Sequence, residues 1–111
     1  MAGISTHILN ASLGQPAQKV LVKLLQQVDQ DYILLDQQFT DADGRIKTFN
    51  IEIFVQGNYQ LIFEVAAYFQ ALNTETFYPR VWIDFKVMDI QQHYHVPLLI
   101  SPFSYSTYRG S

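Results

Sequence analysis

Strict alternation of apolar and polar residues is the feature that most limits what this chain can fold into. In the segment 59–65 every second residue, starting at 59, is apolar: Tyr59, Leu61, Phe63 and Val65. In the segment 80–89 the apolar set on one side is Val81, Ile83, Phe85 and Val87. Because successive side chains of a β-strand point to opposite faces, this period of two predicts half-buried strands with one apolar face each.

Six further segments have the composition of strands, and one helical segment interrupts them. We expect strands over residues 4–9, 19–28, 32–40, 46–54, 93–101 and 104–108. Tight turns are expected at Asp43-Gly44 and Gly57-Asn58, and a longer bend at residues 13–16. Residues 66–72 are rich in helix formers and end at Asn73-Thr74, which predicts one or two helical turns. About eight short strands with one short helix predict an all-β fold, a sandwich of two sheets.

The length and the low charge bear on domain and subunit organisation. The chain has 111 residues, which fits one domain over residues 1–111 and leaves no room for a second core. Charged residues make up 15% of it, against roughly 25% in typical soluble domains. A surface this poor in charge favours an oligomer, in which other subunits cover part of it.

The charge balance and the absence of cysteine exclude several classes of protein. The formal net charge is −3 and the Lys and Arg residues do not cluster, so nucleic acid is not an expected partner. The chain has no cysteine, which excludes disulfides, thiolate zinc sites and a cysteine nucleophile. No apolar run approaches the roughly 20 residues that span a bilayer, so no membrane partner is expected. No signal peptide is visible, so we expect a cytoplasmic protein; a leader removed beforehand would make the periplasm the alternative.

Three histidines are the first candidates for chemistry, because imidazole exchanges protons near neutral pH. His93 and His95 are two positions apart in an expected strand, so they project from one face, about 7 Å apart. His7 lies in the first expected strand, on the same face as Ser5 and Leu9. This spacing permits a zinc site of three histidines, but His-x-His is a weak signal, and hydrogen-bonded structural histidines are the simpler interpretation.

Pro97 and the last residues of the chain give two further hints. Proline cannot donate to a strand ladder, so the strand over 93–101 is either an edge or irregular at Pro97, and its side chains are candidates to line a cleft. Residues 104–108 have strong β character close to the end of the chain, which would hold the last hydroxyl and the terminal carboxylate in place. An edge strand that simply ends there is the plainer interpretation.

Several fragments, in order along the chain, resemble one family. The segment 4–10, Ile-Ser-Thr-His-Ile-Leu-Asn, followed by residues 12–17, is similar to the opening of the transthyretin-related proteins. Asp43-Gly44-Arg45 resembles their arginine turn, and Phe77-Tyr78-Pro79 precedes a strand as it does in that family. The segment 93–111, from His-Tyr-His-Val-Pro to Tyr-Arg-Gly-Ser, resembles the ending of the 5-hydroxyisourate hydrolases. Its last four residues are the mark that separates those hydrolases from the hormone carriers of the family.

This resemblance implies a transthyretin-like sandwich of eight strands with a short helix after the fifth. It also implies a homotetramer, a dimer of dimers with clefts at the dimer–dimer interface. The implied activity is hydrolysis of 5-hydroxyisourate in urate degradation, without a cofactor or a metal. The family's catalytic positions fall on His7, Arg45, His95 and Ser111. The positions that would bind substrate fall on Tyr108, Arg109 and Gly110.

The resemblance gives His93 no catalytic role, and one position departs from the pattern. Ser104 stands where the family leads us to expect glycine, which concerns a turn rather than chemistry.

The implied reaction is attack of water on a ring carbonyl of a strained cyclic ureide, with opening of a C–N bond. Water needs a base at neutral pH. Either His7 or His95 can serve; we favour His7, with the other histidine orienting the water or protonating the leaving nitrogen. Arg45 offers a fixed fork of donors for the planar oxygens of the substrate and for charge growing on the carbonyl. The Ser111 hydroxyl, with its carboxylate, would hold the substrate or a histidine tautomer.

Two other functions compete with this one. A carrier of transthyretin type would hold a hydrophobic hormone in a central channel, but an apolar ligand gains nothing from the desolvation of two histidines and an arginine. A zinc-dependent cyclic amide hydrolase would use His7, His93 and His95 as ligands. We expect any metal bound at the His-x-His region to be incidental or inhibitory.

Overall fold

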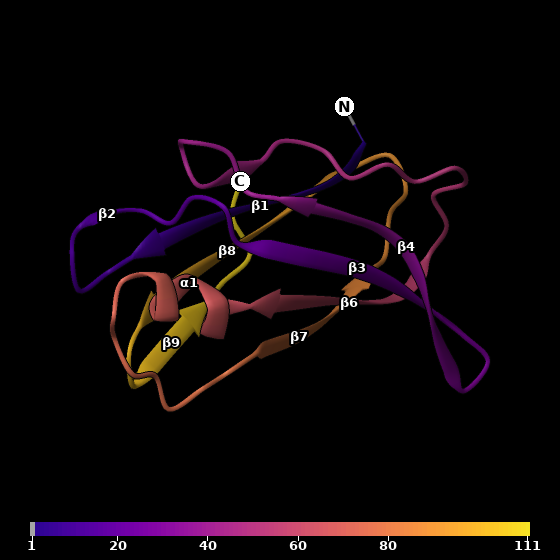
Figure 1. The fold of residues 1–111 in the computed structure, drawn as a ribbon. Coiled ribbons are helices and arrows are strands. Elements are labelled where there is room, and N and C mark those ends of the chain that lie inside the picture. Colours follow the sequence, from indigo (N-terminus) through magenta and orange to yellow (C-terminus); the bar gives the residue numbers. More distant parts are fainter. Residues whose placement is uncertain (1) are drawn as a thin grey trace.

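Two β-sheets packed face to face make up the fold of the computed structural model, which describes residues 2–111 (Figure 1). The first sheet contains β1 (Gly3–Asn10), β2 (Gln15–Pro16), β5 (Arg45–Ile46), β8 (His93–Ser101) and β9 (Ser104–Thr107). The second sheet contains β3 (Leu21–Val28), β4 (Asp31–Phe39), β6 (Gly57–Glu64) and β7 (Val81–Val87). The helix α1 (Val65–Ala71) follows β6 directly, and within residues 2–111 no helix has the length and apolar character needed to cross a membrane. The all-β sandwich expected from the alternation is confirmed.

The middle of the first sheet joins the two ends of the chain. β1 runs parallel to β8 and in register along its whole length, beginning with Gly3 beside His93. The strand β9 pairs with the other edge of β8, and the short β5 pairs antiparallel with β1, so that Arg45 lies opposite His7. Residues from both ends of the sequence and one from its middle therefore meet on a single sheet.

The core lies between the two sheets and follows the predicted alternation. In β7 the inward side chains are buried or half-buried, whereas Trp82, Asp84 and Lys86 point outward and are exposed. The largest fully buried side chains include Tyr59, Phe63, Phe69, Ile4, Ile8, Leu24, Leu61, Leu98 and Ile100. Burial of one such aliphatic or aromatic side chain contributes about 1.5–3 kcal/mol to folding, so these residues hold the two sheets together.

The expected strand over residues 46–54 is wrong. Only Arg45–Ile46 pairs with β1, and residues 47–54 run irregularly along the edge of β4. There a side chain replaces the ladder, because Asp36 Oδ2 accepts a hydrogen bond from the Asn50 backbone N–H at 2.8 Å. The β-type composition of this segment is satisfied by contacts of its side chains with the core rather than by strand pairing.

Of the two expected tight turns, one is wrong and one is confirmed. Gly57 and Asn58 open β6, where they lie opposite Val87 and Lys86. The turn before β5 forms as expected, with Gly44 at φ 74°. A Cβ atom on Gly44 would lie 2.5 Å from the Ile8 carbonyl oxygen, so only glycine fits there. This close approach holds the start of β5 against β1.

Pro97 lies in the middle of the first sheet, so the prediction that its strand is an edge is wrong. β8 is flanked by β1 on one side and by β9 on the other. The alternative prediction, a local irregularity, is confirmed. The β8–β9 ladder ends where Leu98 lies opposite Thr107, and the next pairing is an isolated bridge between His95 and Gly110. Across the gap the Thr107 hydroxyl donates to the Pro97 carbonyl oxygen at 2.7 Å.

Candidate active site

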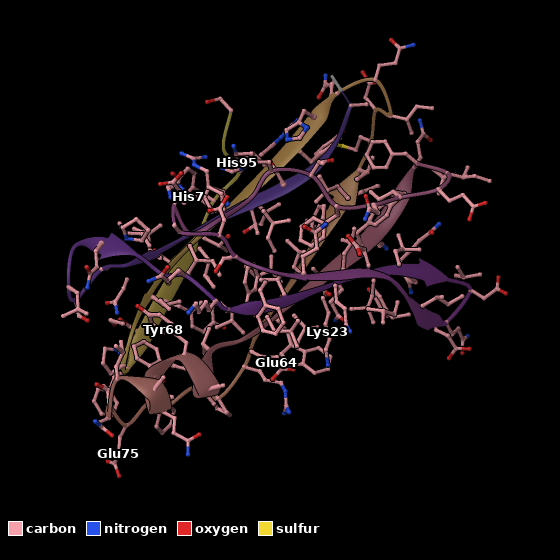
Figure 2. All side chains as sticks on the ribbon, turned by 45° about the horizontal axis from the view of Figure 1, so that its top comes forward. His7, Lys23, Glu64, Tyr68, Glu75 and His95 are labelled. Carbon is pink, nitrogen blue, oxygen red and sulfur yellow. The ribbon has the colours of Figure 1, made fainter. Side chains whose placement is uncertain are left out.

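A polar cleft of about 230 Å³ opens on the face of the first sheet that points away from the core. Its walls come from β1, β5, β8 and the last residue of the chain: Ser5, Thr6, Arg45, Ile46, Lys47, His93, His95 and Ser111. The parallel pairing of β1 with β8 puts Ser5 beside His95, and the pairing of β1 with β5 brings in Arg45. Figure 2 shows His7 and His95 close together on this side of the molecule, away from Lys23 and Glu64.

Ser5 joins the two histidines of β8. Its Oγ lies 2.7 Å from His93 Nε2 and 2.7 Å from His95 Nδ1. The side chain is withdrawn from water, with the residue only 6% exposed. Both hydrogen bonds hold the rings in fixed orientations, and they leave the Nε2 of His95 as the nitrogen available to a substrate or a water. The prediction that His93 and His95 project from one face is confirmed.

Gly110 and Ser111 close the cleft beside His95. The Gly110 backbone N–H donates to the His95 carbonyl oxygen at 2.8 Å. A Cβ atom on Gly110 would lie 2.6 Å from Cδ2 of the His95 imidazole, so the last residues can approach the ring only because position 110 is glycine. This contact seats Ser111 in the wall of the cleft.

His7 lies next to the cleft rather than in its wall. It is paired across the strands with Arg45, and both side chains are on the same face of the sheet. The Asp41 carboxylate fixes the preceding turn, because its Oδ1 accepts from the backbone N–H groups of Asp43 and Arg45, each at 2.9 Å. The turn therefore fixes the backbone position from which the Arg45 side chain extends.

The electrostatics favour neutral imidazoles at both positions. Burial is the main cause that lowers the pKa of His95 below the ordinary 6.5, and the cation Arg45 lowers it further, followed by His7 and His93. The pKa of His7 is also lowered, again by burial first and by Arg45 second. A hydrogen bond with the Asp43 backbone and the nearby carboxylates act in the opposite direction on His7. Both rings are thus able to accept a proton at neutral pH.

Tyr108 and Arg109 do not line this cleft within one chain. They border a second cavity of about 240 Å³, between β7 and β8. The Arg109 guanidinium lies over the ring of Tyr94, 4.5 Å from its centroid, and its Nη2 donates to Gln92 Oε1 at 2.9 Å. The expected part of Tyr108 and Arg109 in substrate binding therefore stays a prediction.

Four residues that line the cleft had no role assigned from the sequence, Ser5, Thr6, Ile46 and Lys47, and His93 entered only as a ligand of the zinc alternative. The sequence did hold a signal for Ser5, because it lies two positions before His7 and therefore on the same face of the expected strand. Its hydrogen bonds to β8, however, follow from a parallel pairing across nearly the whole chain, which periodicity does not reveal.

The three histidines do not supply a metal site within one chain. Among residues 2–111, no group of three or more His, Cys, Asp or Glu side chains gathers closely enough to hold an ion.

Comparison with known proteins adds a family to this site. The model of the HIUase/Transthyretin family matches residues 4–110. This chain belongs to that family. It is 41% identical over 115 residues to a 5-hydroxyisourate hydrolase of Caulobacter vibrioides, with 100% of each chain covered. The structure of Klebsiella pneumoniae 5-hydroxyisourate hydrolase has 40% identity and a TM-score of 0.86, covering 97% of this chain and 98% of that chain. Transthyretin from Sparus aurata has 29% identity and a TM-score of 0.92, covering 99% of this chain and 97% of that chain.

Within the HIUase/Transthyretin family, the backbone does not separate enzyme from transthyretin. The TM-score is higher to the transthyretin of Sparus aurata, 0.92 against 0.86, although the identity is higher to the Klebsiella hydrolase, 40% against 29%. The expected transthyretin-like sandwich is confirmed by both. Because one fold carries both kinds of protein, the side chains of the cleft must decide the function.

Proposed function

We propose that this chain hydrolyses 5-hydroxyisourate in urate degradation. Full-length relatives about 40% identical to it are 5-hydroxyisourate hydrolases, among them the Caulobacter protein. The observation that carries the proposal is the polar cleft, in which His95, Arg45 and Ser111 converge from separate elements beside His7. These groups match the needs of a hydrolytic ring opening: a base for water, a cation for the growing oxyanion and a hydroxyl that holds the substrate.

We assign the activation of water to His95. Its Nδ1 is engaged by Ser5, its ring lines the cleft, and its pKa is lowered by burial and by Arg45, so that Nε2 accepts a proton at neutral pH. From the sequence His7 was the favoured base, but it adjoins the cleft without lining it. In this proposal His7 orients the water, and an imidazole returns a proton to the leaving nitrogen.

Arg45 stabilises the charge that develops on the attacked carbonyl. Its guanidinium lines the cleft together with Lys47, so two basic side chains face the site. As the water oxygen bonds to the carbonyl carbon, the oxygen of that carbonyl becomes negative and is held by the arginine. Removal of one such donor from a preorganised site typically costs about 10²–10³-fold in kcat. The Ser111 hydroxyl then donates to or accepts from the polar edge of the ring.

A carrier function is the second candidate, because the fold itself permits it. The lining of the cleft speaks against an apolar ligand. Two imidazoles, a guanidinium and an ammonium group would lose hydration on binding without gaining hydrogen bonds in return. A planar ureide with several carbonyl and N–H groups replaces those lost contacts.

We further propose that the chain assembles as a homotetramer, a dimer of dimers. Its low charge, 15% of residues, supports this, as do large apolar side chains left exposed on the single chain, among them Phe103, Tyr105 and Tyr108. Subunit contacts would also bring Tyr108 and Arg109 of one chain near the cleft of another. Light scattering coupled to size exclusion tests this assembly, and a monomeric mass at micromolar concentration would reject it.

The function is tested by a spectroscopic assay in which urate oxidase generates 5-hydroxyisourate in situ. The chain should accelerate the decay of the intermediate well beyond the spontaneous rate, and His7→Ala and His95→Ala should each remove this acceleration. Activity should survive exhaustive chelation. A decay rate that the chain leaves unchanged would reject the enzyme, and binding of an apolar aromatic ligand without turnover of 5-hydroxyisourate would favour the carrier.

A further inference from the structure

The hydroxyl of Ser5 is shared between two imidazoles that the proposed chemistry treats differently. Its Oγ is 2.7 Å from His93 Nε2 and 2.7 Å from His95 Nδ1, and Ser5 is almost fully withdrawn from water. A serine hydroxyl has one proton to donate and lone pairs that accept. It links the two rings as a proton carrier when it donates to one of them while it accepts from the other.

We propose that Ser5 and His93 form a proton relay that serves His95, with both residues acting as positioning residues. The role rests on the function proposed above, because it assumes that His95 takes the proton of the attacking water. The relay gives His93 a role in the reaction. Neither the sequence nor the position of His93 in the cleft wall assigns that role by itself.

In the forward half of the relay, from the water to His93, every proton released by one atom is accepted by another. At the start His95 carries its proton on Nδ1 and donates it to Ser5 Oγ, while the Ser5 hydroxyl donates to His93 Nε2 and His93 holds its own proton on Nδ1. The water oxygen bonds to the carbonyl carbon, and the water proton moves to His95 Nε2. The Nδ1 proton of His95 passes to Ser5 Oγ, and the Ser5 proton passes to His93 Nε2. His95 ends neutral, and His93 ends as the imidazolium.

The return direction restores the starting state. As the C–N bond breaks, the leaving nitrogen takes the proton from His95 Nε2. The proton on His93 Nε2 passes back to Ser5 Oγ, and the Ser5 proton passes back to His95 Nδ1. The water proton has then reached the leaving nitrogen, and no external acid or base is consumed.

The charges around the cleft make this transfer favourable for the reaction. His95 faces Arg45, His7 and His93, Lys47 lines the same cleft, and the Asp41 and Asp43 carboxylates lie on the side of His7. Burial lowers the pKa of His95 most, and Arg45, His7 and His93 lower it further, so a positive charge held on that ring is disfavoured. The relay moves the positive charge from the His95 ring to the His93 ring, two residues earlier in β8.

The geometry makes a prediction about tautomers that is independent of activity. When Ser5 donates to one ring and accepts from the other, its contacts with His95 Nδ1 and His93 Nε2 require two neutral rings to carry their protons both on Nδ1 or both on Nε2. The chain has three histidines, so 15N-histidine NMR spectra of the unmodified protein can be assigned with His7→Gln. Protons on Nδ1 of both His93 and His95 are expected; opposite tautomers, or a His95 ring protonated on Nε2, would overturn the relay.

The kinetic test uses Ser5→Ala, with Ser5→Thr as the variant that keeps the hydroxyl. Ser5→Ala should lower kcat by about 10²-fold, with KM changed less than twofold, because the proton transfer rather than substrate binding is impaired. Ser5→Thr should regain most of kcat. His93→Phe should resemble Ser5→Ala, and the double variant should be no slower than either single one, since the two residues act as a unit.

Matched controls separate the relay from folding and from the proposed function. Ser101→Ala removes a serine hydrogen bond at the far end of β8, to Ser104, and should leave kcat unchanged. An active unmodified protein whose kcat is unaffected by Ser5→Ala would overturn the relay alone. An inactive unmodified protein would overturn the proposed function, and the NMR result would still decide whether Ser5 couples the two rings. If Ser5→Ala does not fold, the tautomers of the unmodified protein decide between the relay and its absence.

Discussion

The outward faces of the two sheets carry polar side chains in different ways. On the second sheet, Glu64 pairs with Arg80 at 2.7 Å and with Lys23 at 3.6 Å, in contact with water. On the first sheet, Ser5 and His95 are linked at 2.7 Å, and Ser5 is only 6% exposed. Figure 2 shows the two groups on different sides of the molecule. Both faces follow the same alternation, and what distinguishes the site is that an almost fully buried hydroxyl joins two imidazoles there.

This difference has a physical reason. Exposed ion pairs contribute roughly 0–1 kcal/mol, since water and salt screen them. Polar groups withdrawn from water must find partners within the protein, and they hold fixed positions when they do. The exposed ion pairs of the second sheet and the enclosed polar groups of the first therefore differ in how strongly a substitution is felt.

The largest effect is expected for His95→Ala. Loss of the ring removes the proton acceptor of the cleft and leaves the Ser5 hydroxyl with one partner. The value of kcat/KM should fall by about 10³-fold, at the middle of the range for general base catalysis. Steady-state rates measure the loss, with circular dichroism as the control for folding. A fall of less than tenfold would place the base elsewhere.

Gly110→Ala should have a smaller effect than His95→Ala; its Cβ would lie 2.6 Å from the His95 ring and 3.2 Å from Pro97. The last two residues must move away, which displaces Ser111 from the cleft wall. We expect kcat/KM to fall about 10-fold or more, in line with the sensitivity of catalysis to small misplacements.

Gly14→Ala is the matched glycine control. Gly14 has φ 68° and open space around its Cβ position, so alanine there strains the backbone without touching the site. It should lower stability by about 1 kcal/mol and leave kcat/KM unchanged. Equal kinetic losses for both glycine variants would show that Gly110 acts only through stability.

Activity should also depend on pH through the two imidazoles. The pKa values of His95 and His7 are both lowered from 6.5, so the neutral, proton-accepting forms persist below that pH. The acid limb of kcat/KM should therefore have its midpoint below 6.5, with a plateau through neutral pH. Protonation favours the unfolded chain, so stability should decline as the pH falls below 6.5. A midpoint above 6.5 would contradict the burial of these rings.

Arg80→Ala should have the smallest effect, because this pair lies on the second sheet, where the arginine side chain is 55% exposed. The free energy of unfolding should change by less than about 1 kcal/mol, measured by urea denaturation, and the change should shrink in high salt. Turnover of 5-hydroxyisourate should not change. A kinetic effect here would show that the two sheet faces are coupled.

Much of the fold follows from the sequence because alternation is a local property. The strands β6 and β7 and the helix after Glu64 form where the period of two and the helix formers predict them. Residues 47–54 do not form a strand: the Phe49 N–H donates to the Ile4 carbonyl oxygen, and the Asn50 N–H donates to the side chain of Asp36 rather than to a neighbouring strand. Those contacts are tertiary, and no local pattern in the segment shows them.

The site is predictable only in part, for the same reason. The positions of His7, Arg45 and His95 come from a family resemblance, and the structure brings all three to one face. Ser5 and His93 were missed because their contacts depend on which strands are neighbours. The sequence also could not show that Arg109 would pack on Tyr94 instead of entering the cleft.

The parallel pairing of β1 with β8 has a consequence for how the chain matures. Ser5 and His95 are separated by 90 positions, so closing that loop is among the most entropically costly steps of folding. Hairpins such as β3–β4 can form earlier, since their partners are near in sequence. During refolding, catalytic activity should therefore return together with the last long-range contacts, later than most of the circular dichroism signal of the β-strands. Turnover then reports when the native state is complete.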